Sequence, residues 1–318
     1  MTNSLTIGLA LGVDAGATST RVAVHALDGT RVGYGRAGAG NPSAHGLSSA
    51  VAAIDTALGR ALAGQDASSV VASLAGISGV VDAMEPELGK VWAGHGIASG
   101  PRLMGDVVIA YVAGSPEPDG SLLLSGTGAV AARIAGHELD AIADGLGWLL
   151  ADVGSGFWIG RAGAKAVISA LDRGSPAGAL VELVVEHFLG AERGPTPRKE
   201  ADRIVRLAQA DHMRLAALST LVSQAAEAGD PLALGIARQA AEHLVATVRR
   251  VHRSGPVVLA GSVLTSEGPV RQAVRELLGG ESVVTAGDAA GAAAWLAARE
   301  LLPEADRRAL HAAFTHSP

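Results

Sequence analysis

Two apolar runs joined by a turn rich in glycine and hydroxyl residues occur once in each half of the chain, and this repeated pattern restricts the fold most. Residues 5–25 read LTIGLALGVDAGATSTRVAVH, and residues 121–133 read SLLLSGTGAVAAR. Each stretch predicts a β-hairpin, since short apolar runs that end at turn residues are typical of buried strands. The repetition predicts two related halves that bind one nucleotide together.

The turn residues are the first candidates for a binding site. Glycine lets the backbone approach a ligand closely, and unpaired backbone N–H groups and hydroxyls in such turns form a nest for phosphate oxygens. We therefore expect the two turns to keep their N–H groups free for phosphate. The candidates are Gly16, Ala17, Thr18 and Ser19 in the first turn and Gly126, Thr127 and Gly128 in the second.

The apolar pattern predicts the same opening of three strands in each half of the chain, followed by strands that alternate with helices. In the first half we expect strands near 6–14, 19–27, 30–37, 69–75 and 102–105, with helices at 43–63 and 84–94. In the second half we expect strands near 121–126, 129–135 and 138–143. Strands alternating with helices indicate an α/β fold with largely enclosed sheets, and the repeated opening indicates an internal duplication.

The remainder of the second half is predicted to be mainly helical, with a turn-rich boundary before it at 114–120, GSPEPDG. Residues 154–255 have helical spacing, including a helix that Asp230 caps before Pro231. The polar, proline-bearing segment 191–200 is expected to be a loop. A buried strand at 256–260 then leads into Gly261 and Ser262, and helices follow at 270–278 and about 289–302.

Composition excludes several classes of protein. The 318 residues contain no cysteine, which rules out disulfides, cysteine-ligated zinc and cysteine-bound iron–sulfur clusters. The net charge is −6 and no long basic run is present, so a nucleic-acid surface is not expected. No apolar stretch reaches the ~18 residues of a membrane span, and no signal peptide is evident. We expect a cytoplasmic protein.

Six sequence blocks, taken in order, resemble the sugar kinases and ATPases of the actin/hexokinase fold. The resemblance is strongest to the N-acetylglucosamine kinases, a group that includes the BadF/BadG/BcrA/BcrD-type ATPases, and it extends over nearly the whole chain. The blocks are GVDAGATSTR (12–21), GNPSAHG (40–46), GDVVIAYVAG (105–114), SGTGAVA (125–131), DGLGWLLADVGSGFWIGR (144–161) and LAGSVL (259–264).

This resemblance implies a two-domain, actin-like (ribonuclease H-like) α/β fold with an interdomain cleft. The N-terminal domain, residues 1–116 completed by the C-terminal helix at about 289–318, would bind sugar and phosphate. The C-terminal domain, residues 117–288 with a helical insertion at about 155–255, would bind the nucleotide. ATP and Mg²⁺ are the implied cofactors, with Asp14 holding Mg²⁺, Gly126–Gly128 holding phosphates, and Gly261 and Ser262 lying beside the adenosine. A carboxylate next to a phosphate-binding turn suits Mg²⁺, which prefers oxygen ligands and keeps several waters.

The family pattern places the catalytic carboxylate at Asp106, where it would accept the proton of the attacking sugar hydroxyl. Taken alone, the residue is better explained as the cap of the helix that follows it, and the flanking blocks favour catalysis. The sugar-binding candidates that the resemblance adds are Asn41, Ser78, Gly147, Trp148 and Asp152. Asp152 could instead cap the helix that begins near Ser155, Asn41 could be a turn residue before Pro42, and Trp148 could belong to the core.

The sequence departs from the family pattern beside the expected sugar pocket. Ala151 and Val153 stand where relatives commonly have glycine and glutamate, and Leu146 stands where many have tryptophan. The sugar is therefore left open among N-acetylglucosamine, glucosamine, N-acetylmuramate and neutral hexoses.

The expected activity is ATP-dependent phosphorylation of the 6-hydroxyl of an amino sugar, most simply N-acetylglucosamine. The alternatives are an ATPase that acts on a protein partner without an iron–sulfur cluster, and a non-catalytic sugar or nucleotide sensor. The expected partners are a sugar and ATP, with no nucleic acid and no membrane, and a homodimer is possible.

Overall fold

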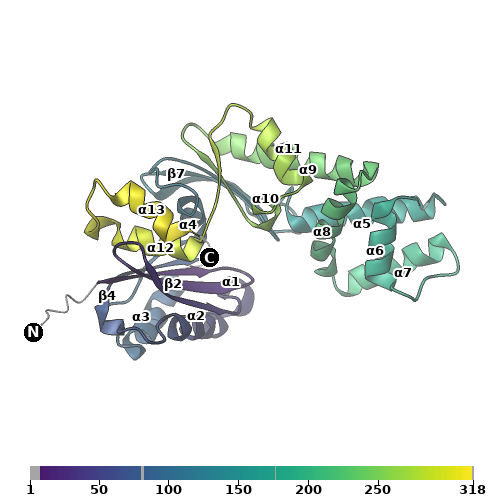
Figure 1. The fold of residues 1–318 in the computed structure, drawn as a ribbon. Helices are drawn as coiled ribbons and strands as arrows, with labels where there is room; N and C mark the ends of the chain where they lie inside the picture. The colour runs from purple at the N-terminus through teal and green to yellow at the C-terminus, as the bar shows by residue number, and fades with distance from the viewer. Residues whose placement is uncertain (1–7, 80–81, 176, 317–318) are drawn as a thin grey trace, which may run out of the picture. The chain divides into compact units, whose positions relative to one another are not determined.

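The computed structural model of the chain describes residues 8–79, 82–175 and 177–316 (Figure 1). It separates into two compact units. The first unit contains the chain up to Pro118 together with 134–139 and the segment from Ala286 onward. The second unit contains 119–133 and 140–285.

The first unit is built on a five-stranded sheet in the order β3-β2-β1-β4-β5. Strand β1 pairs antiparallel with β2, which pairs antiparallel with β3, while β4 and β5 run parallel to β1. The five predicted strands are all present, although the predicted start of the first falls outside the described residues. Their bounds are Leu9–Ala15 (β1), Thr20–Ala26 (β2), Arg31–Ala37 (β3), Val70–Ile77 (β4) and Arg102–Gly105 (β5).

Helices cover both faces of this sheet. The single helix predicted at 43–63 is wrong, because Gly46 has a φ of 82° and interrupts it. Helix α13 was not predicted. The helices are Pro42–His45 (α1), Leu47–Ala61 (α2), Glu85–Gly94 (α3), Asp106–Val112 (α4), Ala289–Ala298 (α12) and Arg307–Thr315 (α13), with short 3₁₀ turns at Ala67–Ser69, Asp82–Met84 and Arg299–Leu301.

The alternation of side chains along β1 determines which helix packs on which face. Leu9, Leu11 and Val13 join the buried cluster formed with α2 and α3. Side chains at the even positions therefore face the other side of the sheet, because successive residues of a strand point in opposite directions. Gly12 meets α12 there so closely that a Cβ would overlap the Ala290 carbonyl oxygen. Asp14 consequently lies on the α12 side of the sheet.

The second sheet repeats the topology of the first. Its order, read from the opposite edge, is β8-β7-β6-β9-β10, so each strand has a counterpart in the first sheet. The predicted duplication is confirmed. The strands are Gly120–Ser125 (β6), Ala129–Ala135 (β7), Glu138–Asp144 (β8), Val257–Ala260 (β9) and Val283–Thr285 (β10), of which β10 was not predicted.

The segment between β8 and β9 is helical, as its spacing predicts, and it forms an aliphatic core with the second sheet. Asp230 caps α9 by accepting hydrogen bonds from the N–H groups of Leu232 and Ala233, as predicted. The loop predicted at 191–200 is wrong in its second part, since α7 begins at Pro197 and Thr196 caps it. The helices are Gly156–Asp172 (α5), Ala179–Leu189 (α6), Pro197–Ala210 (α7), Arg214–Glu227 (α8), Pro231–Val251 (α9), Ser262–Thr265 (α10) and Pro269–Leu277 (α11).

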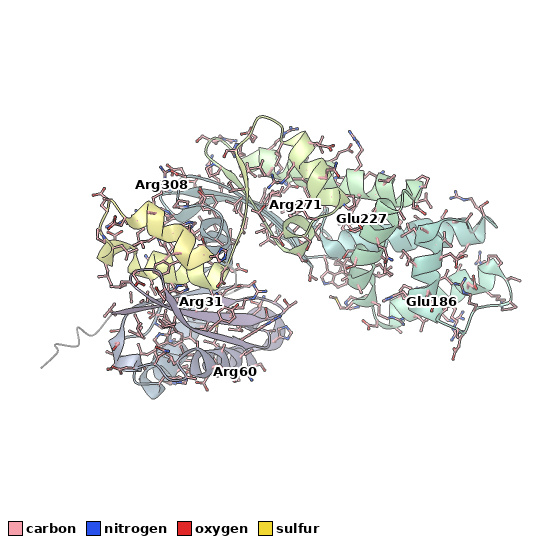
Figure 2. All side chains as sticks on the ribbon, viewed as in Figure 1. Arg31, Arg60, Glu186, Glu227, Arg271 and Arg308 are labelled. Carbon is pink, nitrogen blue, oxygen red and sulfur yellow. The ribbon has the colours of Figure 1, made fainter. Side chains whose placement is uncertain are left out.

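Charged side chains lie mostly on the outside of both units, where Figure 2 labels several, including Arg60 and Glu186. Within the described part of the chain, no helix is both long and apolar enough to cross a membrane.

Candidate functional site

The carboxyl ends of the parallel strands β1, β4 and β5 bring three predicted site residues to one edge of the first sheet. Asp14 pairs in register with Gly76, and Ile77 pairs with Gly105, so Asp14, Ser78 and Asp106 all follow or end these strands. The Ser78 N–H donates a hydrogen bond of 3.0 Å to the Ala15 carbonyl oxygen. In open α/β sheets, ligands bind outside the carboxyl ends of the strands, so this edge is the candidate site.

A chain of hydrogen bonds joins a further sugar-binding candidate, Asn41, to Ser78 and Asp106. The Asn41 Nδ2 group donates to the Ser78 hydroxyl at 3.3 Å, and the Ser78 hydroxyl is hydrogen-bonded to the Asp106 carboxylate. The Asn41 Oδ1 atom accepts from the Ser43 N–H at 2.8 Å, which fixes the orientation of the amide. The structure thus joins residues that lie far apart in the sequence into one polar chain.

Asp106 occupies the first turn of α4, but it does not cap that helix. The N-cap is Gly105, so the capping alternative for Asp106 is wrong. Burial raises the pKa of Asp106 above its usual range, and the hydrogen bond from Ser78 opposes that rise. A partly buried carboxylate with a raised pKa at a strand end has the properties of a general base.

Asp14 is a largely buried carboxylate with one arginine and two other carboxylates acting on it. Its pKa is raised to about 7, chiefly by burial; the Arg21 guanidinium at 3.5 Å opposes the rise, and the negative charges of Asp106 and Asp288 add smaller increases. A divalent cation would compensate this concentration of negative charge, and Mg²⁺ usually binds one or two carboxylates and keeps several waters. Asp14 therefore fits the role of an Mg²⁺ ligand. No cluster of three or more metal-ligating side chains occurs among the residues described.

Asp288 was missed by sequence reasoning. It caps α12 by accepting a hydrogen bond from the Ala290 N–H at 3.1 Å, and it pairs with Arg31 at 3.4 Å. The sequence did contain a signal for Asp288, namely a repeated Gly-Asp pair. Gly105-Asp106 begins a helix after the last strand of the first sheet, and Gly287-Asp288 begins a helix after the last strand of the second sheet. The duplication thus places two Gly-Asp pairs in the first unit, with both charges acting on Asp14.

The first glycine turn closes on itself more than expected. The Gly16 N–H donates to the Ser19 carbonyl oxygen at 3.0 Å, and the Gly16 carbonyl oxygen accepts from the Gly40 N–H. The expectation of free N–H groups is therefore wrong at Gly16, because the tight turn uses that donor internally. Ala17 and Thr18 are exposed at the tip of the turn, and Ser19 is buried.

In the second turn, which belongs to the other unit, the N–H of the first glycine is likewise hydrogen-bonded within the turn. The Gly126 N–H donates to the Gly128 carbonyl oxygen at 2.9 Å, so it is not free either. The Gly126 carbonyl oxygen accepts from the Gly156 N–H at 2.7 Å. Gly261, with a φ of 80°, lies so close that a Cβ would overlap the Ser125 carbonyl oxygen. The structure thus brings the predicted phosphate turn and the predicted adenosine residues side by side.

The loop after β8 supports this second turn. The Asp152 carboxylate accepts from the Gly147 N–H at 3.0 Å, and a Cβ on Gly128 would lie 2.6 Å from its Oδ2. The Asp144 carboxylate, which sequence reasoning missed, accepts from the N–H groups of Asp152 and Val153 at 2.9 and 3.0 Å. Burial raises the pKa of Asp152, and the charge of Asp144 raises it further.

The capping alternative for Asp152 is wrong, because Ser155 caps α5. Asp152, Gly147 and Trp148 belong to the second unit, whereas Asn41, Ser78 and Asp106 belong to the first. The six predicted sugar-binding residues thus form two local groups, each connected within its own unit.

Trp148 anchors the same loop by aromatic contacts. Its ring is stacked on His212 at a centroid distance of 4.5 Å and inclined to Phe157 at 4.6 Å. Three leucines of the loop are exposed, in contrast to the tryptophan: Leu146, Leu149 and Leu150.

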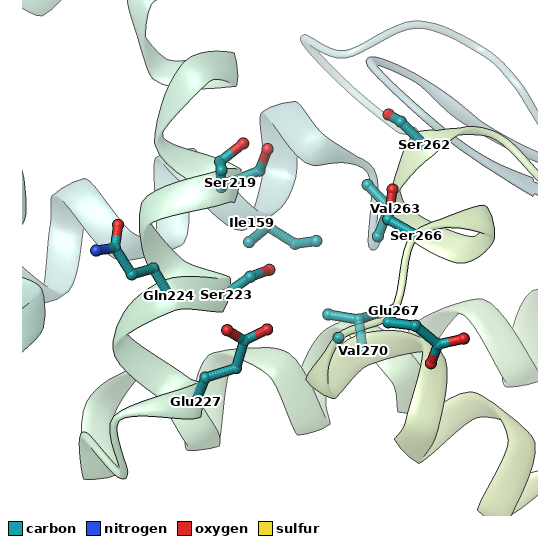
Figure 3. Close-up of a pocket in the computed structure, with 12 residues that line it drawn as sticks. Ile159, Ser219, Ser223, Gln224, Glu227, Ser262, Val263, Ser266, Glu267 and Val270 are labelled. Atoms are coloured by element: carbon teal, nitrogen blue, oxygen red, sulfur yellow. The ribbon is translucent and has the colours of Figure 1, made fainter.

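A cavity of about 280 Å³ lies beside Ser262 in the second unit (Figure 3). Its walls come from α8 and from the segment that contains α10, with Ile159 and Val270 as apolar lining. A polar cavity next to a glycine turn can hold a nucleoside whose phosphates extend to that turn.

A sequence model described as the BadF/BadG/BcrA/BcrD ATPase family matches residues 11–297. A comparison with functionally curated proteins gives no match.

Several solved structures are similar over most of their length. A provisionally assigned N-acetylglucosamine kinase from Chromobacterium violaceum has 27% identity and a TM-score of 0.69, over 92% of this chain and 99% of that one. A provisionally assigned N-acetylglucosamine kinase from Porphyromonas gingivalis has 20% identity and a TM-score of 0.61, over 85% and 90%. A ROK family glucokinase from Streptomyces griseus, solved with glucose and AMPPNP, has 21% identity and a TM-score of 0.57, over 92% and 100%. The expected actin-like α/β fold with two halves is confirmed.

Proposed function

The chain belongs to the BadF/BadG/BcrA/BcrD ATPase family, and we propose that it is an ATP-dependent kinase that phosphorylates the 6-hydroxyl of an amino sugar, N-acetylglucosamine first among the candidates. The observation that carries this proposal is the hydrogen-bonded chain Asn41–Ser78–Asp106 at the carboxyl edge of the first sheet. This polar chain could position a base beside the hydroxyl group of a small substrate. An ATPase that acts on a protein partner has no such hydroxyl group to activate. The likeness to a provisionally assigned N-acetylglucosamine kinase at 27% identity supports the choice of sugar class.

In the proposed reaction, Asp106 is the general base. As the sugar oxygen forms its bond to the γ-phosphorus of ATP, the hydroxyl proton passes to the Asp106 carboxylate and the bond from phosphorus to the bridging oxygen breaks, releasing ADP. Phosphoryl transfer requires mainly positioning and neutralisation of charge. Ser78 orients the base, and Asn41 orients Ser78.

The remaining candidates hold the nucleotide and its metal. Asp14 would hold Mg²⁺, which neutralises phosphate charge when bound. Ala17, Thr18 and Thr127 would contribute the turn donors, since the N–H groups of the first glycine in each turn are used internally. Gly261 and Ser262 would lie beside the adenosine.

The test is an ADP-release assay with Mg²⁺ and ATP against a panel of hexoses and amino sugars, with a control without sugar. We expect turnover on one amino sugar well above that control, with mass spectrometry locating the phosphate on the 6-position. The Asp106→Asn variant should lose about 10²–10⁴-fold in kcat and still bind ADP.

Asp55→Asn is the matched control. Asp55 lies on α2 of the same unit and pairs with His95 at the surface, so the kcat of the Asp55→Asn variant should equal that of the unaltered protein. ADP release that no sugar stimulates would replace the kinase by an ATPase with another partner. Full turnover by Asp106→Asn would show that Asp106 is not the general base.

A further inference from the structure

The cavity beside Ser262 is lined on one side by the exposed carboxylate of Glu227. Glu227 is the last residue of α8, a position where the helix dipole disfavours negative charge. Among the described residues, none forms a hydrogen bond or an ion pair with the Glu227 side chain. Figure 3 shows the Glu227 carboxylate directed into the cavity, whereas Gln224 and Glu267 point away from it.

One end of the cavity adjoins the second glycine turn. A Cβ on Gly126 would lie 3.9 Å from the Ser262 nitrogen, and a Cβ on Gly156 would lie 3.3 Å from the Ser219 hydroxyl. Ser219 and Ser262 both line the cavity. A nucleotide whose phosphates meet this turn would therefore enter the cavity past these two serines.

Glu227 lies at the opposite end of the same helix face. It follows Ser219 by eight residues along α8, about 12 Å of rise. Ser223 lies between them and also points into the cavity (Figure 3). Because the base is the part of a nucleotide most distant from the phosphates, Glu227 is placed to contact the base rather than the ribose.

The chemistry of the side chain then selects the base. A carboxylate accepts hydrogen bonds and donates none. Adenine presents an exocyclic amino group at C6, whereas hypoxanthine presents a carbonyl oxygen there, which would repel a carboxylate that faces the C6 substituent rather than the neighbouring N1–H. We infer that Glu227 determines the phosphoryl donor by accepting a hydrogen bond from the adenine amino group.

This inference rests on the proposed use of ATP, and calorimetric titration tests it without the sugar reaction. We expect the unaltered protein to bind ADP about tenfold more tightly than inosine 5′-diphosphate. In Glu227→Gln, the new amide can donate to the hypoxanthine oxygen, so the ratio of the two affinities should fall to near one. Glu276→Gln is the matched control, because Glu276 lies on α11 outside this cavity and pairs with Gln272; it should keep the original ratio.

The other outcomes overturn the inference in distinct ways. An unchanged ratio of ADP to inosine diphosphate in Glu227→Gln would remove Glu227 from base recognition while leaving ATP use intact. A variant that instead loses its preference for ADP over 2′-deoxy-ADP would place the carboxylate at the ribose. Tighter binding of GDP than of ADP by the unaltered protein would show that the carboxylate accepts from the guanine N–H groups. Absence of ADP binding by the unaltered protein would defeat the proposed function itself.

Discussion

Replacing Asp144 by alanine should loosen the loop that supports the second glycine turn. The Asp144 carboxylate accepts two backbone hydrogen bonds, from Asp152 at 2.9 Å and from Val153 at 3.0 Å. Asp144 and Asp152 both have positive φ values, 63° and 54°. A non-glycine residue in that region costs roughly 1–2 kcal/mol, so the loop depends on these bonds to hold its conformation.

The expected magnitude follows from the two bonds. A hydrogen bond to a charged group contributes about 1.5–3 kcal/mol when it is buried. Asp144 is half-buried, so we take about 1 kcal/mol for each bond, or ~2 kcal/mol for both. That loss should lower the Tm of the second unit by about 4–8 °C. If all of it is transferred to nucleotide binding, the Kd for ADP should rise by up to about thirtyfold.

Three substitutions at Asp144 separate the backbone from the hydrogen bonds. Asp144→Asn keeps one acceptor oxygen and should lose about 1 kcal/mol. Asp144→Gly loses both bonds but tolerates the positive φ, so it should be about 1 kcal/mol more stable than Asp144→Ala. Asparagine and glycine should therefore be about equally stable, and both should be more stable than alanine.

Differential scanning calorimetry and ADP titration would measure both effects. Asp140→Ala is the control, since Asp140 lies on the same strand and pairs with Arg133 at the surface, where an ion pair is worth about 0–1 kcal/mol. An Asp144→Ala variant with an unaltered Tm and an unaltered Kd for ADP would refute the reasoning. A lower Tm with an unaltered Kd would limit the role of Asp144 to stability.

Two further predictions concern the first unit. Gly12→Ala should destabilise the protein by about 3 kcal/mol or more in urea unfolding, because the added methyl group meets the backbone of α12. Gly38→Ala is the control, since a Cβ at that position has open space around it. Equal stability of the two variants would contradict the packing described. Ser78→Ala removes a hydrogen bond that lowers the pKa of Asp106, so that pKa should rise. Because the base must be ionised, the acidic limb of the kcat–pH profile should move to higher pH, and a profile that stays in place or moves to lower pH would exclude this coupling.

The strands were predictable because their signal is local. Apolar runs bounded by turn residues gave the limits of β5 and β7 as the structure has them. Strand β10 has only three residues, too few to form such a run. The start of helix α7 was missed although Thr196 and Pro197 are a typical helix start, because the polar composition of 191–200 masked the narrow apolar face of a surface helix.

The candidate site was predictable residue by residue but not as an arrangement. Asp14, Ser78 and Asp106 each followed an apolar run, which marked the strand ends where ligands bind. Nothing local indicated that Ser78 bonds Asp106, or that Asp144 supports Asp152, because these contacts join separate segments. Glu227 ends an ordinary amphipathic helix, and only the cavity in front of it distinguishes it from other surface glutamates.

The sequence by itself determined the duplicated strand order and the family, since glycine turns and apolar periodicity are written in neighbouring residues. The tertiary structure decided which charges meet. It placed Asp288, from the far end of the chain, where its charge acts on Asp14, and it consumed the N–H groups of Gly16 and Gly126 within their own turns. Both results depend on how the chain returns through space, because electrostatic and hydrogen-bonding energies depend on distances that sequence separation does not set.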